Sequence, residues 1–198
     1  SGASESSRMT DILVDGVKFE NITRHGIFSA NVDGIRVLNC EMQFIGGYHP
    51  NTDVSLHHGN CIEIGSNARN VLVDGLTASH VLDTIVTCQM GGTGDATSDH
   101  HVYQNITANL YGMHLAEFTI FDAASGVRRM EDFLLSDCVS TDQGLGWSGD
   151  RNGGGLNILN LRTVSGSGMT RIFGHNIVSN RNYRLYLGSG HNGVCGIQ

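Results

Sequence analysis

The chain has 198 residues, enough for one domain with a sizeable core and too few for two ordinary domains without a linker. With 19 acidic and 12 basic residues its formal net charge is −7, and no stretch concentrates Lys and Arg, which disfavours nucleic-acid binding through phosphates. No apolar run approaches the roughly 20 residues needed to cross a bilayer, so we expect no membrane segment.

The chain opens with small polar residues and no apolar signal-peptide core. We interpret residues 1–11 as a linker or an artificial leader and 12–198 as one domain, compatible with a piece of a longer protein. The 27 glycines and single proline indicate frequent corners made with backbone freedom. Five scattered cysteines without a CxxC pair signal neither a disulfide framework nor a zinc site, and we expect most to be buried.

A short unit recurs along the chain. Each copy alternates apolar and other residues, turns at a Gly, Asn or Asp corner, and alternates again. The copies begin at Ile12, Ile35, Val71, His101, Phe133 and Leu156, and a weaker one follows from Asn176 to Leu187. The first two starts are 23 residues apart, and middle copies carry insertions. Such a pattern predicts short strands stacked into a solenoid, with the starting residues in one interior column.

The tripeptide Val-Asp-Gly occurs at residues 14–16, 32–34 and 73–75. Its middle copy precedes a strand, whereas the other two lie inside their units. We therefore interpret it as a turn device, in which Asp caps backbone amides and Gly supplies positive φ, rather than as a row of catalytic aspartates.

From about Ile12 onward the chain resembles the right-handed parallel β-helix repeats of the pectate-lyase-like superfamily. The segments 45–48, 59–64, 70–71 and 83–85 are similar to one found in many bacterial β-helix repeat proteins. The resemblance implies an all-β fold, a right-handed parallel β-helix of about six to seven coils with loop insertions beside one face. The superfamily includes polysaccharide lyases, polygalacturonases, uronate epimerases, phage tailspikes and adhesins, so the fold does not choose a chemistry.

A further strand is expected in each coil, at residues 27–29, 62–64, 85–87, 113–115 and 145–147. Insertions at 46–60, 90–100, 122–130 and 148–155 would wall this sheet into a cleft. If Ile62 and Ile64 point inward, Glu63 points outward, and the same count turns Phe28, Val86 and His114 outward. Glu63 and His114, two coils or roughly 10 Å apart, could act as acid and base across a sugar.

The insertions add groups suited to proton transfer and to binding. They are His49, Asp53, His57 and His58 in the first, Asp95, Asp99, His100 and His101 in the second, and Asp150 and Arg151 in the last. From these we take His58 as a catalytic candidate and His57 and Arg151 as substrate-binding candidates. His101 also aligns with an apolar column, which favours burial. Trp147 is either a sugar-stacking ring or a core residue.

Asp83 and His80 lie on the corner before residue 85. Asp83 could join Glu63 in a carboxylate pair of the glycosidase type, or it could cap a turn. Gln89 follows on the far side of the same strand and could bind substrate hydroxyls. Adjacent His-His pairs lack zinc-motif spacing, so no metal site is assigned, although calcium stays open as a cofactor.

These patterns favour a polysaccharide-processing enzyme of the lyase, glycoside hydrolase or uronate epimerase type. The alternative is a non-catalytic glycan-binding or structural module, such as a segment of a phage tailspike or adhesin, for which we would expect a homotrimer. Either function implies a glycan partner and a secreted, virion-surface or cell-surface location.

Overall fold

The structure, a computed structural model, describes residues 8–47, 59–144, 157–163, 166–180 and 195–197. Every element in these ranges is a strand, and every strand pair is parallel. The all-β prediction is therefore confirmed. A helix long and apolar enough to cross a membrane is not found in the described ranges.

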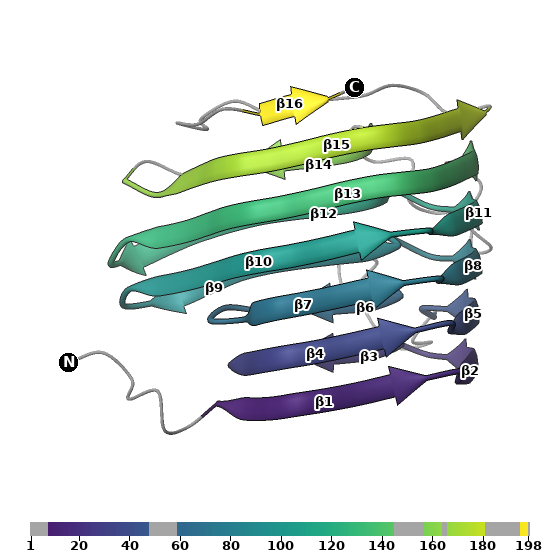
Figure 1. The fold of residues 1–198 in the computed structure, drawn as a ribbon, viewed down its shortest axis with the longest axis horizontal. Coiled ribbons are helices and arrows are strands. Elements are labelled where there is room, and N and C mark those ends of the chain that lie inside the picture. The colour runs from purple at the N-terminus through teal and green to yellow at the C-terminus, as the bar shows by residue number, and fades with distance from the viewer. Residues whose placement is uncertain (1–7, 48–58, 145–156, 164–165, 181–194, 198) are drawn as a thin grey trace.

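The strands form two parallel sheets (Figure 1). The five-stranded sheet has the order β14 (Asn157–Arg162), β12 (His114–Ser125), β9 (Val86–Thr93), β6 (Ile62–Ile64) and β3 (Ile27–Ser29). The eleven-stranded sheet runs through β1 (Met9–Asp15), β4 (Val32–Leu38), β7 (Arg69–Asp74), β10 (Ala96–Gln104), β13 (Arg128–Gln143), β11 (Thr107–Tyr111), β8 (Thr77–Val81), β5 (Glu41–Ile45) and β2 (Lys18–Ile22). From this path β15 (Gly168–Asn180) pairs with β13, and β16 (Cys195–Ile197) pairs with β15.

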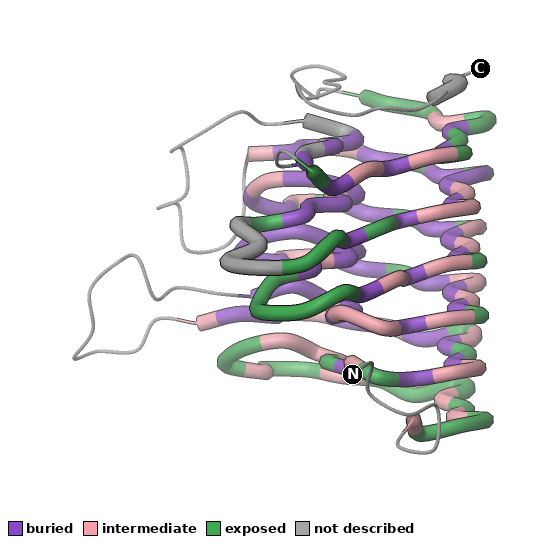
Figure 2. Tube along the Cα trace, turned by 90° about the vertical axis from the view of Figure 1, so that its left-hand side faces the viewer, coloured by how far each residue is buried: buried purple, intermediate pink, exposed green. Residues whose placement is uncertain are grey.

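The pairing joins strands that lie three elements apart in the chain. β1 pairs with β4, β2 with β5 and β3 with β6, and the same step repeats further along. We call each group of three strands a rung, so that β1 to β3 form the first rung, β4 to β6 the second, β7 to β9 the third and β10 to β12 the fourth. The rungs stack on one another, with buried residues recurring along the interior of the stack (Figure 2).

The predicted interior column is confirmed over its first five members. The register aligns Ile12 with Ile35, Val71, His101 and Phe133 in turn. Ile35, Val71, His101 and Phe133 are buried. Parallel in-register pairing places equivalent side chains directly above one another, so this column forms one wall of the core.

The prediction was wrong for the sixth unit, which begins at Leu156. Residues 157–162 form β14 and pair with β12 in the five-stranded sheet, whereas Ile172 of β15 pairs with Phe133. The segment therefore belongs to another face of the stack. Its period-two alternation is the same in either sheet, so the pattern alone could not distinguish the two positions.

Left-handed residues mark the corner that follows this column. They are Gly16, Asn39, Gly75, Asn105, Asp137 and Asn176, with φ between 49° and 74°. Their side chains also link rungs: the amide of Asn39 donates to Asp15 at 3.0 Å, and that of Asn105 donates to Asp74 at 2.7 Å. Gly34 also has a positive φ, so the predicted conformation of the Val-Asp-Gly glycines is confirmed, although residues 32–34 lie inside β4 and not at a turn. The predicted role of the aspartates was wrong, because Asp15, Asp33 and Asp74 accept side-chain amides of the next rung and do not cap backbone amides.

Two predicted insertions are mostly strand rather than loop. β9 continues to Thr93 and β10 begins at Ala96, while β12 continues to Ser125 and β13 begins at Arg128. Paired rungs lengthen together, with Ala96 opposite Arg128. The inserted residues therefore widen the sheets, and the prediction that they form loops walling a cleft was wrong here. The insertions at 46–60 and 148–155 lie largely outside the described residues.

Two further expectations concern buried polar groups. Cys40, Cys61, Cys88 and Cys138 are free and buried, as predicted. His101 is also buried. One ring nitrogen lies 2.9 Å from the hydroxyl of Tyr103 and the other 3.1 Å from the carbonyl of Ala68, and the ring stacks on Phe133. Burial lowers the pKa of His101 to about 3.

Gly112, which lies between β11 and β12, tests the tight stacking. A Cβ at this position would lie 1.9 Å from the carbonyl oxygen of Leu82 in the rung below. We expect Gly112→Ala to cost about 3 kcal/mol, because backbone has to move, and to lower Tm by about 6 to 12 °C in thermal unfolding followed by circular dichroism. The control is Gly168→Ala, where nothing lies within 4 Å of the added methyl. Equal Tm losses in both variants would contradict the packing described.

The buried His101 predicts an acid-dependent loss of stability. Its pKa is about 3 in the fold and about 6.5 in the unfolded chain, so between these values only the unfolded chain takes up the proton. The free energy of unfolding should therefore fall by about 1.4 kcal/mol for each pH unit below 6.5, through this group alone. Urea unfolding from pH 7 to pH 5 should show a shallower pH dependence in His101→Phe. His100→Phe, which removes the exposed neighbouring histidine, should not flatten it.

Candidate functional site

The outward face of the five-stranded sheet carries the first predicted site residue. Ile62 and Ile64 are fully buried, while the Glu63 side chain is 14% exposed and points to the other side of β6. Phe28 occupies the equivalent position of β3 and is 61% exposed. The predicted outward positions of Glu63 and Phe28 are thus confirmed.

The register of the next two strands differs from the prediction. Ile62 pairs with Val86, one residue beyond Ile85, and Val86 pairs with Ala116. Val86 is fully buried and His114 is 1% exposed, so both predicted outward positions were wrong. The residues level with Glu63 are Thr87 and then Glu117.

A pocket of about 360 Å³ opens over this face. It is lined by Arg24, His25, Asn60, Glu63, Asp83, Gln89, Met113, Glu117 and Phe121. Polar side chains predominate, and they come from four consecutive rungs. In the described part of the chain the lining contains three carboxylates and one arginine, so the charge of this part is predominantly negative.

Asn60 organises the lower part of the pocket. Its side-chain carbonyl accepts the backbone N–H of Thr84 at 3.1 Å, which fixes the amide, and its Nδ2 donates to Glu63 Oε2 at 2.8 Å. Asn60 is buried. A buried amide with both ends bonded has one orientation, and it holds the Glu63 carboxylate in place.

His25 lies against the same carboxylate. Its Nδ1 is 3.2 Å from Glu63 Oε2 and also 3.4 Å from the backbone nitrogen of Asn60. A protonated Nδ1 can donate to Glu63, whereas an unprotonated Nδ1 can accept from Asn60, so the ring has a partner in either state. Desolvation by burial lowers the pKa of His25, against the opposing effect of the Glu63 charge.

Glu117 is the second fixed carboxylate. Gln89 Nε2 donates to its Oε2 at 3.2 Å, and the hydroxyl of Thr119 donates to its Oε1 at 3.2 Å. Both oxygens therefore have a donor. Glu63 and Glu117 are two strands apart, or about 10 Å at the backbone. The space between them is open to the pocket.

Asp83 completes the set of carboxylates. It is buried and accepts a hydrogen bond from the hydroxyl of Thr84 at 3.4 Å.

The structure thus brings together three predicted site residues, Glu63, Asp83 and Gln89, in the lining of the pocket. Phe28 lies beside the pocket, with its ring 6.1 Å from the ring of His25. The predicted residues His57, His58, Trp147 and Arg151 lie outside the described residues, as do His49, Asp53 and Asp150.

Sequence reasoning missed His25, Asn60 and Glu117, and it counted Arg24 among the arginines near the cleft without giving it a role. Arg24 and His25 lie on the corner between β2 and β3, outside any alternating run. The position of Arg24 and His25 could have been inferred from the corners. Gly26 donates its backbone N–H to the carbonyl of Asn60, so the corner between β2 and β3 lies directly against the corner that precedes β6. Aligning the corners as well as the strands would have brought the residues together.

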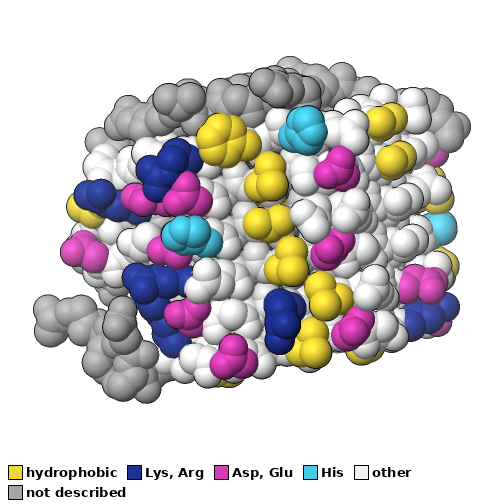
Figure 3. All heavy atoms as spheres, viewed as in Figure 1, with side chains coloured by type: hydrophobic (Ala, Val, Ile, Leu, Met, Phe, Trp, Pro, Cys, Tyr) yellow, Lys and Arg dark blue, Asp and Glu magenta, His cyan; other side chains and the backbone are white. Residues whose placement is uncertain are grey.

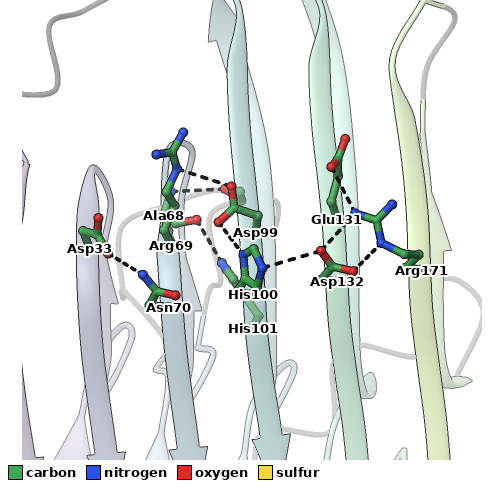
Figure 4. A network of polar contacts seen from close by, with 11 residues as sticks. Asp33, Ala68, Arg69, Asn70, Asp99, His100, His101, Glu131, Asp132 and Arg171 are labelled. Carbon is green, nitrogen blue, oxygen red and sulfur yellow. Dashed lines mark hydrogen bonds and ion pairs between the residues drawn. The ribbon is translucent and has the colours of Figure 1, made fainter.

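A second polar cluster lies on the eleven-stranded sheet, away from the pocket (Figure 4). Asp99 lies 3.3 Å from Arg69 Nε and 3.0 Å from His100 Nδ1, and His100 Nε2 lies 3.7 Å from Asp132. Arg171 donates to the same Asp132 at 2.9 Å. Asp99 and His100 were expected beside the cleft, and that prediction was wrong because they belong to β10. The hydrogen bond to Asp99 raises the pKa of His100.

In the described part of the chain, no three His, Cys, Asp or Glu side chains are grouped closely enough to hold a metal ion. The pocket carboxylates are distributed over successive rungs, each with its own hydrogen-bond donor. What they can offer chemically is proton transfer and hydrogen bonding to hydroxyl groups.

The chain matches no model of a known protein family, no curated protein and no solved structure. Its function is therefore inferred from the chemistry of the pocket.

The pocket predicts opposite pKa responses of His25 to two substitutions. The negative charge of Glu63 raises the pKa of His25 and the positive charge of Arg24 lowers it. We expect Glu63→Gln to lower this pKa further and Arg24→Gln to raise it. Both can be measured by following the His25 ring protons in an NMR pH titration. Glu20→Gln, an exposed change on β2, is the control, and shifts of the same sign in the two pocket variants would contradict the described geometry.

Proposed function

We propose that the stack is a right-handed parallel β-helix of about six to seven coils, of the pectate-lyase-like kind. Its support is the step of three strands between paired neighbours, repeated from β1 to β12. Crossover connections between parallel strands of one sheet are right-handed in about 98% of cases, which supports the hand. Such folds present ligand sites on outward faces formed by successive coils.

We further propose that the chain is a polysaccharide-processing enzyme whose active site is the pocket between Glu63 and Glu117. The observation that carries this proposal is the pair of carboxylates, each oriented by a side-chain amide, two strands apart across an open pocket. Inverting glycosidases place their acid and base roughly 6.5 to 9.5 Å apart, so that a water molecule fits beside the sugar. A backbone separation of about 10 Å is compatible with that arrangement.

Hydrolysis is favoured over β-elimination and epimerisation by the charge of the pocket. Both of the latter reactions remove a proton beside a uronate carboxylate, which needs a cation to neutralise that group. Among the described residues, the lining offers one cation, Arg24, against Glu63, Asp83 and Glu117. A neutral polysaccharide is therefore the better substrate, and a lyase or uronate epimerase would require calcium, which remains a proposal.

The position of each side chain in the pocket gives its proposed role. Glu63 and Glu117 serve as the acid and base pair, and His25 exchanges a proton with Glu63. Gln89 holds Glu117, and the exposed ring of Phe28 offers a stacking surface to a neighbouring sugar. His57, His58, Trp147 and Arg151 stay proposed contributors to catalysis or binding.

A non-catalytic glycan-binding module, such as a tailspike or adhesin segment, is the second candidate. The exposed ring of Phe28 favours it, because an aromatic side chain binds sugars without chemistry. A secreted, virion-surface or cell-surface location and a glycan partner fit both candidates. Fixed paired carboxylates serve a catalyst better than a binding surface, and for this reason the enzyme is preferred.

Activity assays on neutral and uronate polysaccharides, following reducing ends and the absorbance of unsaturated products, test the proposal. We expect release of reducing ends from a neutral substrate without an unsaturated product. Glu63→Gln and Glu117→Gln should each reduce the rate by about 100-fold or more, the usual contribution of a general acid or base. Glu20→Gln serves as the surface control. Full activity in both pocket variants would rule out this site, and glycan binding without turnover would favour the second candidate.

A further inference from the structure

The strand between the two pocket carboxylates is β9, and its outward side forms the floor of the pocket. β9 lies between β6, which carries Glu63, and β12, which carries Glu117. Thr87 is level with both glutamates. Gln89 and Gly91 follow on the same side of the strand, because successive side chains alternate between the two faces of a sheet. The floor therefore ends at a position without a side chain.

The fold itself does not require glycine at residue 91. A Cβ at Gly91 would meet only the Cβ of Phe121, at the ordinary van der Waals distance of 3.9 Å. The φ of Gly91 also lies outside the left-handed region, whereas Gly92, at the step in register between β9 and β12, has a φ of 98°. Gly91 is exposed. A glycine of this kind within a strand is typical of a place where a ligand approaches the backbone closely.

Phe121 forms the wall beside this gap. It lines the pocket and is 39% exposed, whereas Ile120 before it is fully buried. Between Ile120 and Ala123 the register of β12 against β9 shifts, so the strand carries an extra residue at this point. Such bulges re-aim side chains next to ligand sites. The result is an exposed phenyl ring beside an open stretch of floor.

The gap and the carboxylates are separated by more than one sugar ring. Gly91 follows Thr87 by four residues, or about 13 Å of extended strand. A glycan with one bond between the two glutamates therefore reaches the gap with a unit further along its chain. Gly92 and Thr93, at the end of β9, are exposed as well, so the floor continues open beyond the gap.

The chemistry of this surface indicates the class of glycan. A pyranose whose hydroxyl groups are equatorial has two faces of C–H bonds, and such an apolar face packs on a phenyl ring. The three carboxylates of the described lining repel a uronate. The outward residues of β9 lie on one straight line, which suits the extended chain that a β-1,4 linkage gives. Neutral β-1,4-linked glucans and xylans combine these properties.

We propose that Gly91 and Phe121 form a distal subsite that binds one sugar unit of a neutral β-1,4-linked glucan or xylan. The glycan then runs along β9, with another part of the same chain between Glu63 and Glu117. The place of the cleaved bond rests on the proposed function, whereas the subsite requires binding only. Because the floor is open at its far end, the chain is bound at an internal position and long substrates are preferred.

Affinity electrophoresis measures this binding without requiring turnover. Gels that contain hydroxyethylcellulose or soluble xylan should retard the wild-type chain, and gels that contain polygalacturonate should not. Phe121→Ala removes the ring and Gly91→Leu fills the gap, so each should weaken binding about tenfold, the loss expected for one stacking contact. Gly91→Ala adds only a methyl group at van der Waals distance and should keep most of the binding.

The matched control is Phe173→Ala, which should bind as the wild type does. Phe173 is 43% exposed, close to the value for Phe121, but it lies on β15 of the other sheet. Figure 3 shows the outer face of that sheet, which carries a line of hydrophobic side chains with charged side chains on both sides. Unchanged binding in either Phe121→Ala or Gly91→Leu, an equal loss in Phe173→Ala, binding to polygalacturonate alone, or binding to none of the three glycans would overturn the proposal.

Kinetics on cello-oligosaccharides of increasing length separate the subsite from the proposed hydrolysis. Gly91→Leu should raise KM about tenfold for long substrates, leave kcat unchanged, and have no effect on the shortest substrate that is cleaved, because that substrate does not reach the gap. Hydrolysis with the same KM in Gly91→Leu and wild type at every length would refute the subsite and leave the catalytic proposal intact. Conversely, the expected binding pattern without any hydrolysis would refute the catalysis and retain the subsite.

Discussion

The constraint on which the structure depends is the in-register pairing of each rung with the next. Since every edge N–H and C=O must find its partner in the equivalent residue of the neighbouring rung, backbone conformation repeats down each column. Asn21, Phe44, His80, Leu110 and Asp142 show this, because all have φ between 53° and 58°. A left-handed conformation costs roughly 1 to 2 kcal/mol for residues such as Phe and Leu. Phe44 and Leu110 adopt it because the ladder on both sides would otherwise be broken.

The same constraint explains what could be predicted from the sequence. The column through Ile12 was correct because a Gly, Asn or Asp corner follows four residues after each of its members and fixes the phase. The position of Glu63 was correct because this one polar residue lies between Ile62 and Ile64. In β9 and β12 the phase is ambiguous, since Ile85 and Val86 are both apolar and both buried, as are Leu115 and Ala116. A one-residue choice between them inverts the strand. His114 was therefore taken as outward and Glu117 was missed, and a buried histidine was preferred to the glutamate three residues away.

The corners explain the rest of the site. Asn60 uses its side-chain carbonyl to accept the N–H of Thr84, where a regular strand would use backbone. This substitution interrupts the ladder beside β6 and leaves the Asn60 amide available for Glu63. Alternation carries no information about such a residue, because it lies where alternation ends. The sequence could thus locate the face and one carboxylate, while the groups that orient this carboxylate came from corners that only three-dimensional stacking brings together.

The spacing of the two carboxylates follows from the same ladder. Like charges directly opposite on neighbouring strands destabilise a sheet, so an outward column cannot hold Glu on successive rungs without cost. Thr87 lies between Glu63 and Glu117 and separates them by two strands, about 10 Å. A sugar and a water molecule need a similar gap between acid and base. The distance that the sheet tolerates is therefore close to the distance that hydrolysis requires, and a stacked fold reaches it with one intervening neutral residue.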